Sequence, residues 1–232
     1  MEFTPDGPMA IPLWINGRAY LTVGDSFFDV VNPVSGQAQH RVPMCGASEA
    51  LTAVTAAQAA QPGWAAMGLP ARQVCLEQLA DALARYAGHF AKLLRQDVGF
   101  DEARATAEVS EAVTGLRRTS VGDNGVVGLV VDASQPLCGL VDMLVPALLA
   151  GATIVIKPSP KAPSAAYALC ELATRADWPA GVLNVLHGDT AAIEGLCAAG
   201  IDRLLYAGQA ALGVQVGGLA DAAQVPFEMK AG

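Results

Sequence analysis

The sequence predicts an α/β fold in which a doubly wound parallel sheet follows an N-terminal hairpin and a helical segment. The first observation lies between Gly125 and Pro158, where two continuous apolar runs, Val126–Val131 and residues 153–156, flank a longer apolar segment that ends at Gly151. Continuous apolar runs are typical of strands buried on both faces of a parallel sheet. The segment between them is long enough for a crossover helix, and a glycine suits its C-terminal end. We therefore expect strand, helix and strand as the first unit of the sheet.

The second observation is that this alternation continues with short loops to the end of the chain. A βα repeat of this kind predicts a parallel sheet with helices on both faces, as in Rossmann-like domains. The further elements expected are a helix at Ser164–Arg175, a strand at 182–186, a helix at 191–199, a strand at 203–206, a helix at Ala210–Ala222 and a strand at 225–229.

The N-terminal part of the chain carries hairpin and helix signals instead. The pair Asn16-Gly17 between the apolar runs 13–15 and 19–21 is a strong hairpin signal. A third strand is expected at residues 28–31. Four helices are expected: at 49–61 with Ser48 as N-cap and Pro62-Gly63 as the stop, at 70–86, at 89–96, and from about Glu102 onwards. We treat residues 1–232 as a single domain, with the hairpin and helices in residues 1–124 and the βα repeats in residues 125–232.

Composition and charge exclude several classes of protein. Hydrophobic residues make up 53% of the chain and charged residues 16%, a balance that supplies a core and argues against disorder. The formal net charge of -8 argues against nucleic acid or an anionic membrane surface as a partner. Residues 137–156 approach the length of a membrane span, but Asp142, Pro146 and Gly151 interrupt them. We therefore favour a buried helix and strand there.

Cysteine usage points to a reducing environment. The chain has five cysteines, an odd number, and they are widely spaced without any CxxC pair or Cys/His cluster. This pattern argues against a disulfide framework and against a metal site, and it favours the cytoplasm. The first ten residues contain no basic region followed by an apolar core, so no signal peptide is expected.

Three loops at the predicted carboxyl edge of the sheet carry residues suited to a phosphate or ribose. Lys157 follows a buried strand, so its ammonium is expected at the sheet edge. Gly208 and Gly213 bracket the start of a helix, where glycine lets backbone N–H groups approach an anion. The third loop is residues 187–189 (HGD). Each signal is weak alone, because such a lysine is more often a solvated loop cation and such glycines are more often part of a turn. No GxGxxG fingerprint follows the first strand.

Taken together, several short motifs resemble the NAD(P)-dependent aldehyde dehydrogenase superfamily, and they occur in the family's order. The matching segments are residues 15–17 (ING), 32–36 (NPVSG), 56–64 (AAQAAQPGW), 146–151 (PALLAG), 156–159 (IKPS), 179–189 (PAGVLNVLHGD), 206–213 (YAGQAALG) and 227–229 (FEM). The resemblance covers nearly the whole chain and implies a cofactor-binding domain of the aldehyde dehydrogenase type.

The resemblance also implies roles for individual residues. Lys157 and Ser159 correspond to the family motif whose lysine holds the cofactor's adenosine ribose. Gly208, Gln209 and Gly213 correspond to the loop that meets the pyrophosphate. Glu228 corresponds to the general base and is expected to be a vestige of it. No metal is implied, and binding of NAD or NADP is expected to be weak or lost.

Departures from the family pattern accompany these matches. Ser134 stands where the family has the asparagine that stabilises an oxyanion, and Pro160 stands where it has a ribose-binding acid. Gln209 replaces the phosphate-facing serine, and Lys230-Ala231 replaces a pair of glycines. The connection before Val126 is short. None of the five cysteines lies at the position of the family's nucleophile, and the sequence given contains no catalytic domain downstream of Gly232.

Aldehyde oxidation needs a thiolate to attack the carbonyl, a donor for the oxyanion and a hydride acceptor held in place. We therefore expect a catalytically inactive accessory or structural domain with at most residual NAD(P) binding. One alternative is a component of an NAD(P)-dependent aldehyde oxidoreductase that receives its cysteine from another domain or chain. Another is a relic without a role beyond folding. A protein partner is expected over the face that a catalytic domain would otherwise cover.

Overall fold

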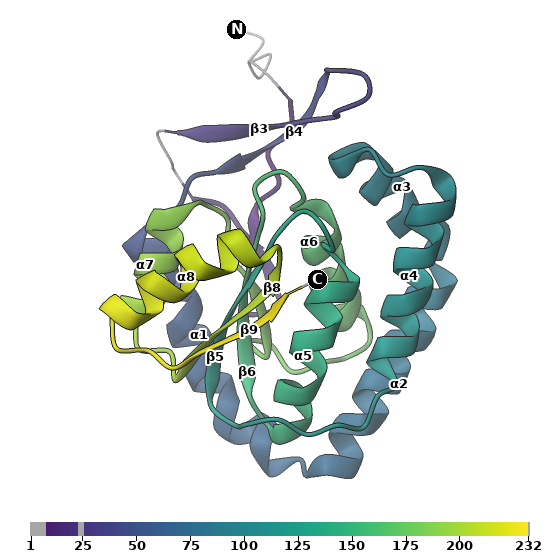
Figure 1. Ribbon diagram of the computed structural model, residues 1–232. Coiled ribbons are helices and arrows are strands. Elements are labelled where there is room, and N and C mark those ends of the chain that lie inside the picture. Colours follow the sequence, from purple (N-terminus) through teal and green to yellow (C-terminus); the bar gives the residue numbers. More distant parts are fainter. Residues whose placement is uncertain (1–7, 23–25, 232) are drawn as a thin grey trace, which may run out of the picture.

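The computed structural model of this protein describes residues 8–22 and 26–231. A seven-stranded sheet in the order β2-β1-β7-β6-β5-β8-β9 forms its centre, and a two-stranded sheet of β3 and β4 lies apart from it (Figure 1). The strands are β1 (Leu13–Ile15), β2 (Arg18–Tyr20), β3 (Phe27–Val31), β4 (Ala38–Pro43), β5 (Val126–Val131), β6 (Thr153–Pro158), β7 (Leu183–Val185), β8 (Arg203–Gly208) and β9 (Phe227–Ala231). The helices are α1 (Ala47–Ala66), α2 (Leu69–Arg85), α3 (Ala87–Val98), α4 (Glu102–Leu116), α5 (Cys138–Ala150), α6 (Ser164–Arg175), α7 (Thr190–Ala198) and α8 (Ala210–Ala222).

The predicted doubly wound α/β fold is confirmed. Strands β5 to β9 pair in parallel, and β5 runs in register with β6 from Val126 opposite Thr153 to Val131 opposite Pro158. Every residue of β5 and β6 is buried. Burial on both faces is the reason that their sequences are continuous apolar runs rather than alternating ones.

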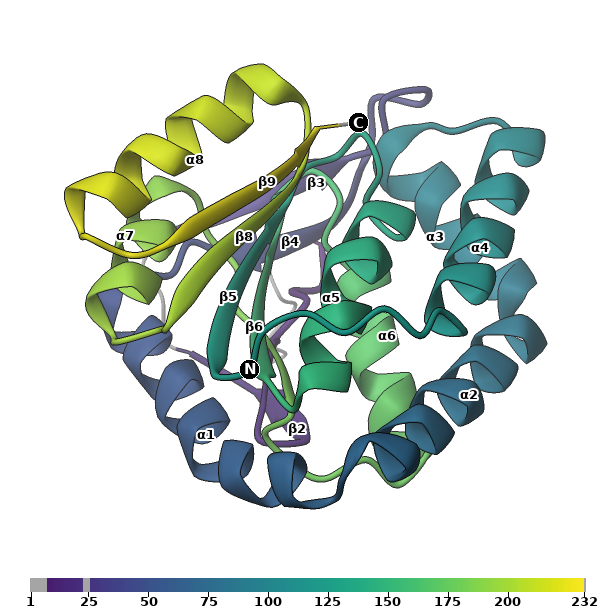
Figure 2. The ribbon, with the colours of Figure 1, turned by 60° about the horizontal axis from the view of Figure 1, so that its bottom comes forward.

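Helices cover both faces of this sheet (Figure 2). On one face, Ile154 and Ile156 of β6 join a core cluster with α5 and α6. Helices α2 and α4 pack against α5, and α3 packs against α6. On the other face, Val155 joins a second core cluster with residues of α1, α7 and α8. The alternation along β6 therefore divides the interior into two cores on opposite sides of one sheet.

The N-terminal hairpin extends the central sheet. Asn16 and Gly17 have φ values of 54° and 72°, as a two-residue turn between paired strands requires, so the predicted hairpin is confirmed. Strand β1 then pairs antiparallel with β7, with Trp14 opposite Val185. Strand β4 is missing from the sequence prediction, because only its last two residues, Val42 and Pro43, are buried and apolar, and its order comes from pairing with β3.

Two expectations for the first helix are wrong. Ser48 lies inside α1 and Gly46 precedes the helix, where the Glu49 carboxylate accepts a 3.3 Å hydrogen bond from the Gly46 backbone nitrogen. Pro62 does not stop the helix, which continues to Ala66. Its ring removes one backbone hydrogen bond, but the following turn is held by fully buried Trp64, whose indole donates to the Leu148 carbonyl at 3.1 Å.

No helix in the described part of the chain is both long enough and apolar enough to cross a bilayer.

Candidate functional site

The order of the strands creates a topological switch point at the carboxyl edge of the sheet. From β5 the chain winds outward through β6 and β7, and then returns to place β8 on the opposite side of β5. The winding therefore reverses between β5 and β8. Ligands of open α/β sheets bind outside the carboxyl ends of the strands at this kind of switch point. Asp132 and Ser134 follow β5 there, and Gln209 follows β8.

The Asp132 carboxylate fills the switch point. It accepts hydrogen bonds from the backbone nitrogen of Gln209 at 2.7 Å, from the backbone nitrogen of Ser134 at 2.7 Å and from the Ser134 hydroxyl. The Tyr206 hydroxyl lies 3.2 Å from Asp132 Oδ2 and 3.0 Å from the carbonyl oxygen of Gln209. Burial opposes ionisation, but the hydrogen bonds from Gln209, Ser134 and Tyr206 outweigh it and lower the pKa of Asp132. The group is therefore a carboxylate at neutral pH.

Gly208, the last residue of β8, and Gln209, which precedes α8, lie against this carboxylate. Gly208 has a φ of 146°, and a Cβ atom on it would lie 2.2 Å from Asp132 Cγ. Gln209 is the N-cap residue of α8, and its own side chain makes no capping hydrogen bond. The charge nearest to the positive end of the α8 dipole is therefore that of Asp132. Gly213 follows in the first turns of α8, where a Cβ atom would overlap Met229 Sδ.

Lys157 lies on the same edge but is buried. It pairs in register with Val130 of β5, and only 5% of its surface is exposed, so the interpretation as a solvated loop cation is wrong. Among the described residues its ammonium group has no hydrogen bond or ion pair. Burial lowers the pKa of Lys157 to about 8, although the charge of Asp189 opposes the shift.

The loop residues 187–189 approach Lys157 from the end of β7. His187 is 1% exposed, and its Nε2 lies 3.0 Å from the carbonyl oxygen of Pro12. Its Nδ1 is buried and has no hydrogen-bond partner within residues 8–22 and 26–231. Burial, with a smaller contribution from the charge of Lys157, lowers the pKa of His187 to about 4, although the hydrogen bond with Pro12 opposes the shift. Asp189 caps α7 through a 3.2 Å hydrogen bond from the Ala191 backbone nitrogen.

A cavity of about 840 Å³ opens above the ends of β5, β6 and β8, beneath β3. Ser159 lines it together with the cation Lys161. Arg104 also lines it, and its guanidinium stacks on the Phe100 ring at 3.8 Å and donates to the Ser134 carbonyl oxygen at 3.2 Å. The remaining lining residues are Phe28, Asp29, Val31, Pro33, Asp97, Val98, Phe100, Asp132, Ala133, Ser134, Gln209 and Leu212. Of the expected cofactor residues, the structure places Ser159 and Gln209 on this cavity.

Glu228 is separated from that cavity. It is exposed on β9 and lines another hollow with Asp142, Arg203 and Lys230. Asp142 forms ion pairs with Lys230 at 2.5 Å and with Arg118. The structure therefore places the expected general base beside an ion-pair network that links α5 to β9.

None of the five cysteines is suited to nucleophilic attack. Four are buried, and Cys75 is partly exposed. Cys138 opens α5, where burial and the charge of Glu108 raise the pKa of its thiol to about 12. Burial raises the pKa of Cys45 to about 12 as well. A reactive cysteine needs a lowered pKa and access to solvent; the pKa values of all five thiols are raised, and only Cys75 has partial access to solvent.

Comparison with known proteins identifies the family. The family model described as Aldehyde dehydrogenase family matches residues 21–121 and 119–232. This chain belongs to the aldehyde dehydrogenase family. The resemblance seen in the motifs is thereby confirmed.

Relatives and solved structures agree with this assignment. N-succinylglutamate 5-semialdehyde dehydrogenase of Escherichia coli (strain SE11) is 32% identical over 227 residues, which are 88% of this chain and 46% of that protein. Succinate-semialdehyde dehydrogenase (NADP(+)) of Escherichia coli (strain K12) is 30% identical over 77% of this chain and 42% of its own. The structure of an indole-3-acetaldehyde dehydrogenase from P. syringae in complex with NAD+ superimposes with a TM-score of 0.88 at 25% identity, covering 98% of this chain and 52% of that one. This chain spans about half the length of these aldehyde dehydrogenases.

The site fits the cofactor of an aldehyde dehydrogenase only in part. Lys157, which is 5% exposed, supplies a cation without a partner in the described part of the chain, and such a cation suits the hydroxyls of a ribose. The start of α8 does not suit a pyrophosphate, because the Asp132 carboxylate already accepts from Gln209 there. Two anions at one helix N-terminus repel each other. We therefore derive no catalytic step through a bound dinucleotide.

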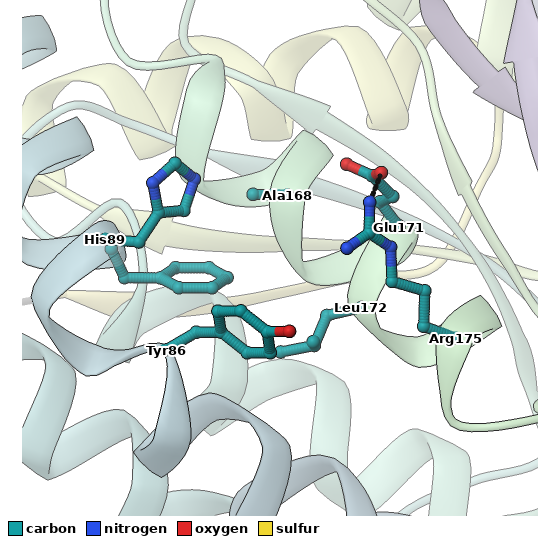
Figure 3. Close-up of a pocket in the computed structure, with 7 residues that line it drawn as sticks. Tyr86, His89, Ala168, Glu171, Leu172 and Arg175 are labelled. Atoms are coloured by element: carbon teal, nitrogen blue, oxygen red, sulfur yellow. Dashed lines mark hydrogen bonds and ion pairs between the residues drawn. The ribbon is translucent and has the colours of Figure 1, made fainter.

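A second pocket, of about 390 Å³, lies between α3 and α6 (Figure 3). Tyr86, Phe90 and Leu172 give it apolar walls, and Glu171 and Arg175 pair with each other at 2.5 Å on α6. The two charges pair with each other on one helix and are partly exposed, so they would contribute little binding free energy to a ligand. None of the expected cofactor residues lines this pocket.

Sequence reasoning missed the central residue of the site. The motifs do not single out Asp132, and Tyr206 appears only as the first residue of a matching segment. An acidic residue directly after a continuously apolar strand at a switch point is a signal that could have singled out Asp132.

Proposed function

We propose that this chain is an aldehyde dehydrogenase-like domain that does not itself oxidise aldehydes and acts as an accessory or structural component, with at most weak binding of NAD(P). Family and fold support the first half of this proposal. The five free cysteines favour a reducing, cytoplasmic setting for it.

The observation that carries the proposal is the hydrogen bonding of Ser134. Its hydroxyl and its backbone nitrogen both donate to Asp132, and its carbonyl oxygen accepts from Arg104. No donor of Ser134 is left for a developing oxyanion. Loss of one such donor typically costs about 3–4 kcal/mol in the transition state, and no activated thiol stands nearby to begin the reaction.

Weak cofactor binding follows from the opposite effects of two charged groups on one edge of the sheet. Lys157 favours a ligand with oxygen atoms, because its side chain is mostly buried and its ammonium has no acceptor among the described residues. Asp132 disfavours a ligand phosphate through its charge. The sum supports a dissociation constant for NAD or NADP of about 1 mM or weaker.

Titration calorimetry of the purified chain with NAD, NADH, NADP and NADPH tests this proposal. Millimolar or absent binding is the expected result, and Lys157→Met should abolish whatever affinity is measured. Micromolar binding that survives Lys157→Met would overturn the cofactor part of the proposal.

A second candidate is a dehydrogenase component that receives its thiol from another domain or chain. The presence of Glu228 and Lys157 at the family positions favours it, together with the match to about half the length of the relatives. Mixing the chain with proteins encoded beside it, in the presence of NAD and aldehydes, should then produce NADH. Failure of every such mixture removes this candidate.

Either role implies a protein partner, and we propose that it contacts the open edge of the sheet. Strand β9 is the last strand on that side, and exposed apolar side chains lie on it and on the neighbouring α8: Met229, Leu212 and Val214. Light scattering of the pure chain, alone and with candidate partners, measures the association. A monodisperse monomer that binds none of them contradicts this part.

A further inference from the structure

We propose that Asp132 is a built-in anion that takes the place of a ligand phosphate at the start of α8 and so makes this crevice discriminate against phosphate-bearing ligands. The inference rests on the proposed function, because it gives the reason for weak cofactor binding. It assigns Asp132 as the residue that determines the specificity of the site.

The first argument is the set of donors that Asp132 collects. The backbone nitrogen of Gln209, the N-cap of α8, donates to Asp132 Oδ2 at 2.7 Å, and the Tyr206 hydroxyl lies 3.2 Å from the same oxygen. The other carboxylate oxygen accepts from the backbone nitrogen and the hydroxyl of Ser134. A helix N-terminus with backbone N–H groups aimed at one point suits an anion such as a phosphate. In this chain that point is taken by a carboxylate.

The second argument is that Asp132 differs from an ordinary helix cap. Asp101 and Asp189 cap α4 and α7 by accepting from backbone nitrogens three and two residues further on. Asp132 instead reaches α8 from another strand, 77 residues earlier in the chain. It follows β5, the neighbour of β8 at the switch point, and so occupies the place outside the strand ends where a ligand would bind.

The third argument is the close approach of the backbone at Gly208. A Cβ atom there would lie 2.2 Å from Asp132 Cγ, so the space that glycine leaves is occupied by the carboxylate. A phosphate placed against the same backbone would meet both the atoms and the charge of Asp132. Lys157, 5% exposed and without a hydrogen bond among the described residues, lies on the same sheet edge but is not one of the residues that line the cavity.

The test compares Asp132→Asn with the wild-type chain. Asparagine keeps an oxygen that can accept from Gln209 but carries no charge. Asp221→Asn is the matched control, because Asp221 is exposed near the opposite end of the same helix and its loss changes the net charge equally. Calorimetry measures the affinities for ADP and for adenosine, which differ in the phosphates.

Asp132→Asn should bind ADP at least about tenfold more tightly than the wild-type chain, because removal of a neighbouring anion lowers the repulsion. Its affinity for adenosine should change less than about twofold, since adenosine carries no charge to repel. Asp221→Asn should behave as the wild type for both ligands. An unchanged or weaker affinity for ADP, an equal gain for adenosine, or an equal gain in Asp221→Asn would each overturn the proposal.

Thermal unfolding with inorganic pyrophosphate covers the case in which Asp132→Asn is unstable. Pyrophosphate should raise the melting temperature of Asp132→Asn, or restore its folding, with little effect on the wild-type chain. No such rescue overturns the proposal. The two proposals fail on different results. Tight cofactor binding or turnover by the wild-type chain would contradict the proposed function. An ADP affinity of Asp132→Asn that does not exceed that of the wild type would contradict this inference.

Discussion

The carboxylate of Asp132 at the end of β5 accepts a 2.7 Å hydrogen bond from the backbone nitrogen of Gln209 at the start of α8. This contact joins the two strands between which the winding of the sheet reverses. In a parallel α/β sheet such a position ordinarily serves a ligand. Here a side chain of the protein satisfies it, and the contact links the fold to the expected loss of cofactor affinity.

The close packing of Gly208 on Asp132 predicts a large effect of a single methyl group. Gly208→Ala should lower the free energy of unfolding by about 3 kcal/mol or more, because the added Cβ overlaps the carboxylate and the φ of 146° disfavours alanine. Gly218 lies on the exposed face of α8 with open space around it, so Gly218→Ala should instead raise the free energy of unfolding by about 0.5–1 kcal/mol. Urea unfolding of both variants measures the two values. Equal effects would contradict the packing described for Gly208.

Burial of the Lys157 ammonium predicts a stability that rises in alkaline solution. The pKa falls from 10.5 to about 8 on folding, so between these values the unfolded chain holds more protons and stability increases with pH. Lys157→Met should be more stable than the wild type below pH 8, by up to about 3 kcal/mol. The advantage should shrink as the pH approaches 10.5.

Urea unfolding of the wild type and Lys157→Met across this range gives the difference directly. Other groups that titrate there, such as cysteines and tyrosines, are common to both proteins and cancel. A difference that stays constant with pH would show that Lys157 keeps its proton as easily as it does in water.

The buried carboxyl of Asp97 predicts an opposite trend in acid. It accepts from the backbone nitrogen of Ser164 at 2.9 Å and from its hydroxyl at 3.0 Å, yet burial raises its pKa from 3.8 to about 6. The folded state then holds the proton more tightly, and this contribution to stability is lost as the pH rises from about 4 to about 6. Asp97→Asn should exceed the wild type by up to about 3 kcal/mol at neutral pH and match it below pH 4. Urea unfolding of both proteins at the two pH values measures this difference. A difference in the free energy of unfolding that is the same at both pH values would contradict the raised pKa of Asp97.

The cysteines are expected to react slowly with alkylating reagents. Cys45 and Cys138 combine burial with a pKa of about 12, so few thiolates form at neutral pH. Cys75, which is partly exposed, should be the fastest of the five. Mass spectrometry after timed treatment with iodoacetamide, with and without denaturant, measures each rate. Rapid labelling of Cys138 in the folded chain would contradict its burial and raised pKa, and would indicate a nucleophilic thiol in this domain.

The sequence was most informative where burial alone decides the structure. Strands β5 and β6 and helices α6 and α8 lie where their apolar patterns placed them, because a strand covered on both faces must be apolar at every position. The sequence patterns gave the wrong result where a contact between residues far apart in the chain decides the local structure. Helix α1 passes Pro62 because Trp64 is anchored to Leu148, and nothing in the sequence near Pro62 reveals that bond.

The candidate site divides in the same way. The motifs correctly indicated that Lys157, Gly208 and Gln209 lie along one sheet edge, since the carboxyl ends of parallel strands meet there. They did not reveal that Lys157 is buried. They also did not reveal that Asp132 reaches Gln209, because that contact depends on strands 77 residues apart being neighbours in the sheet.

The most direct test of this account is the rate of NADH formation by the purified chain with NAD and a panel of aldehydes. The account predicts no rate above that of a buffer control, and no change when all five cysteines are alkylated in denaturant and the chain is refolded. A steady, aldehyde-dependent formation of NADH that disappears on alkylation would contradict it.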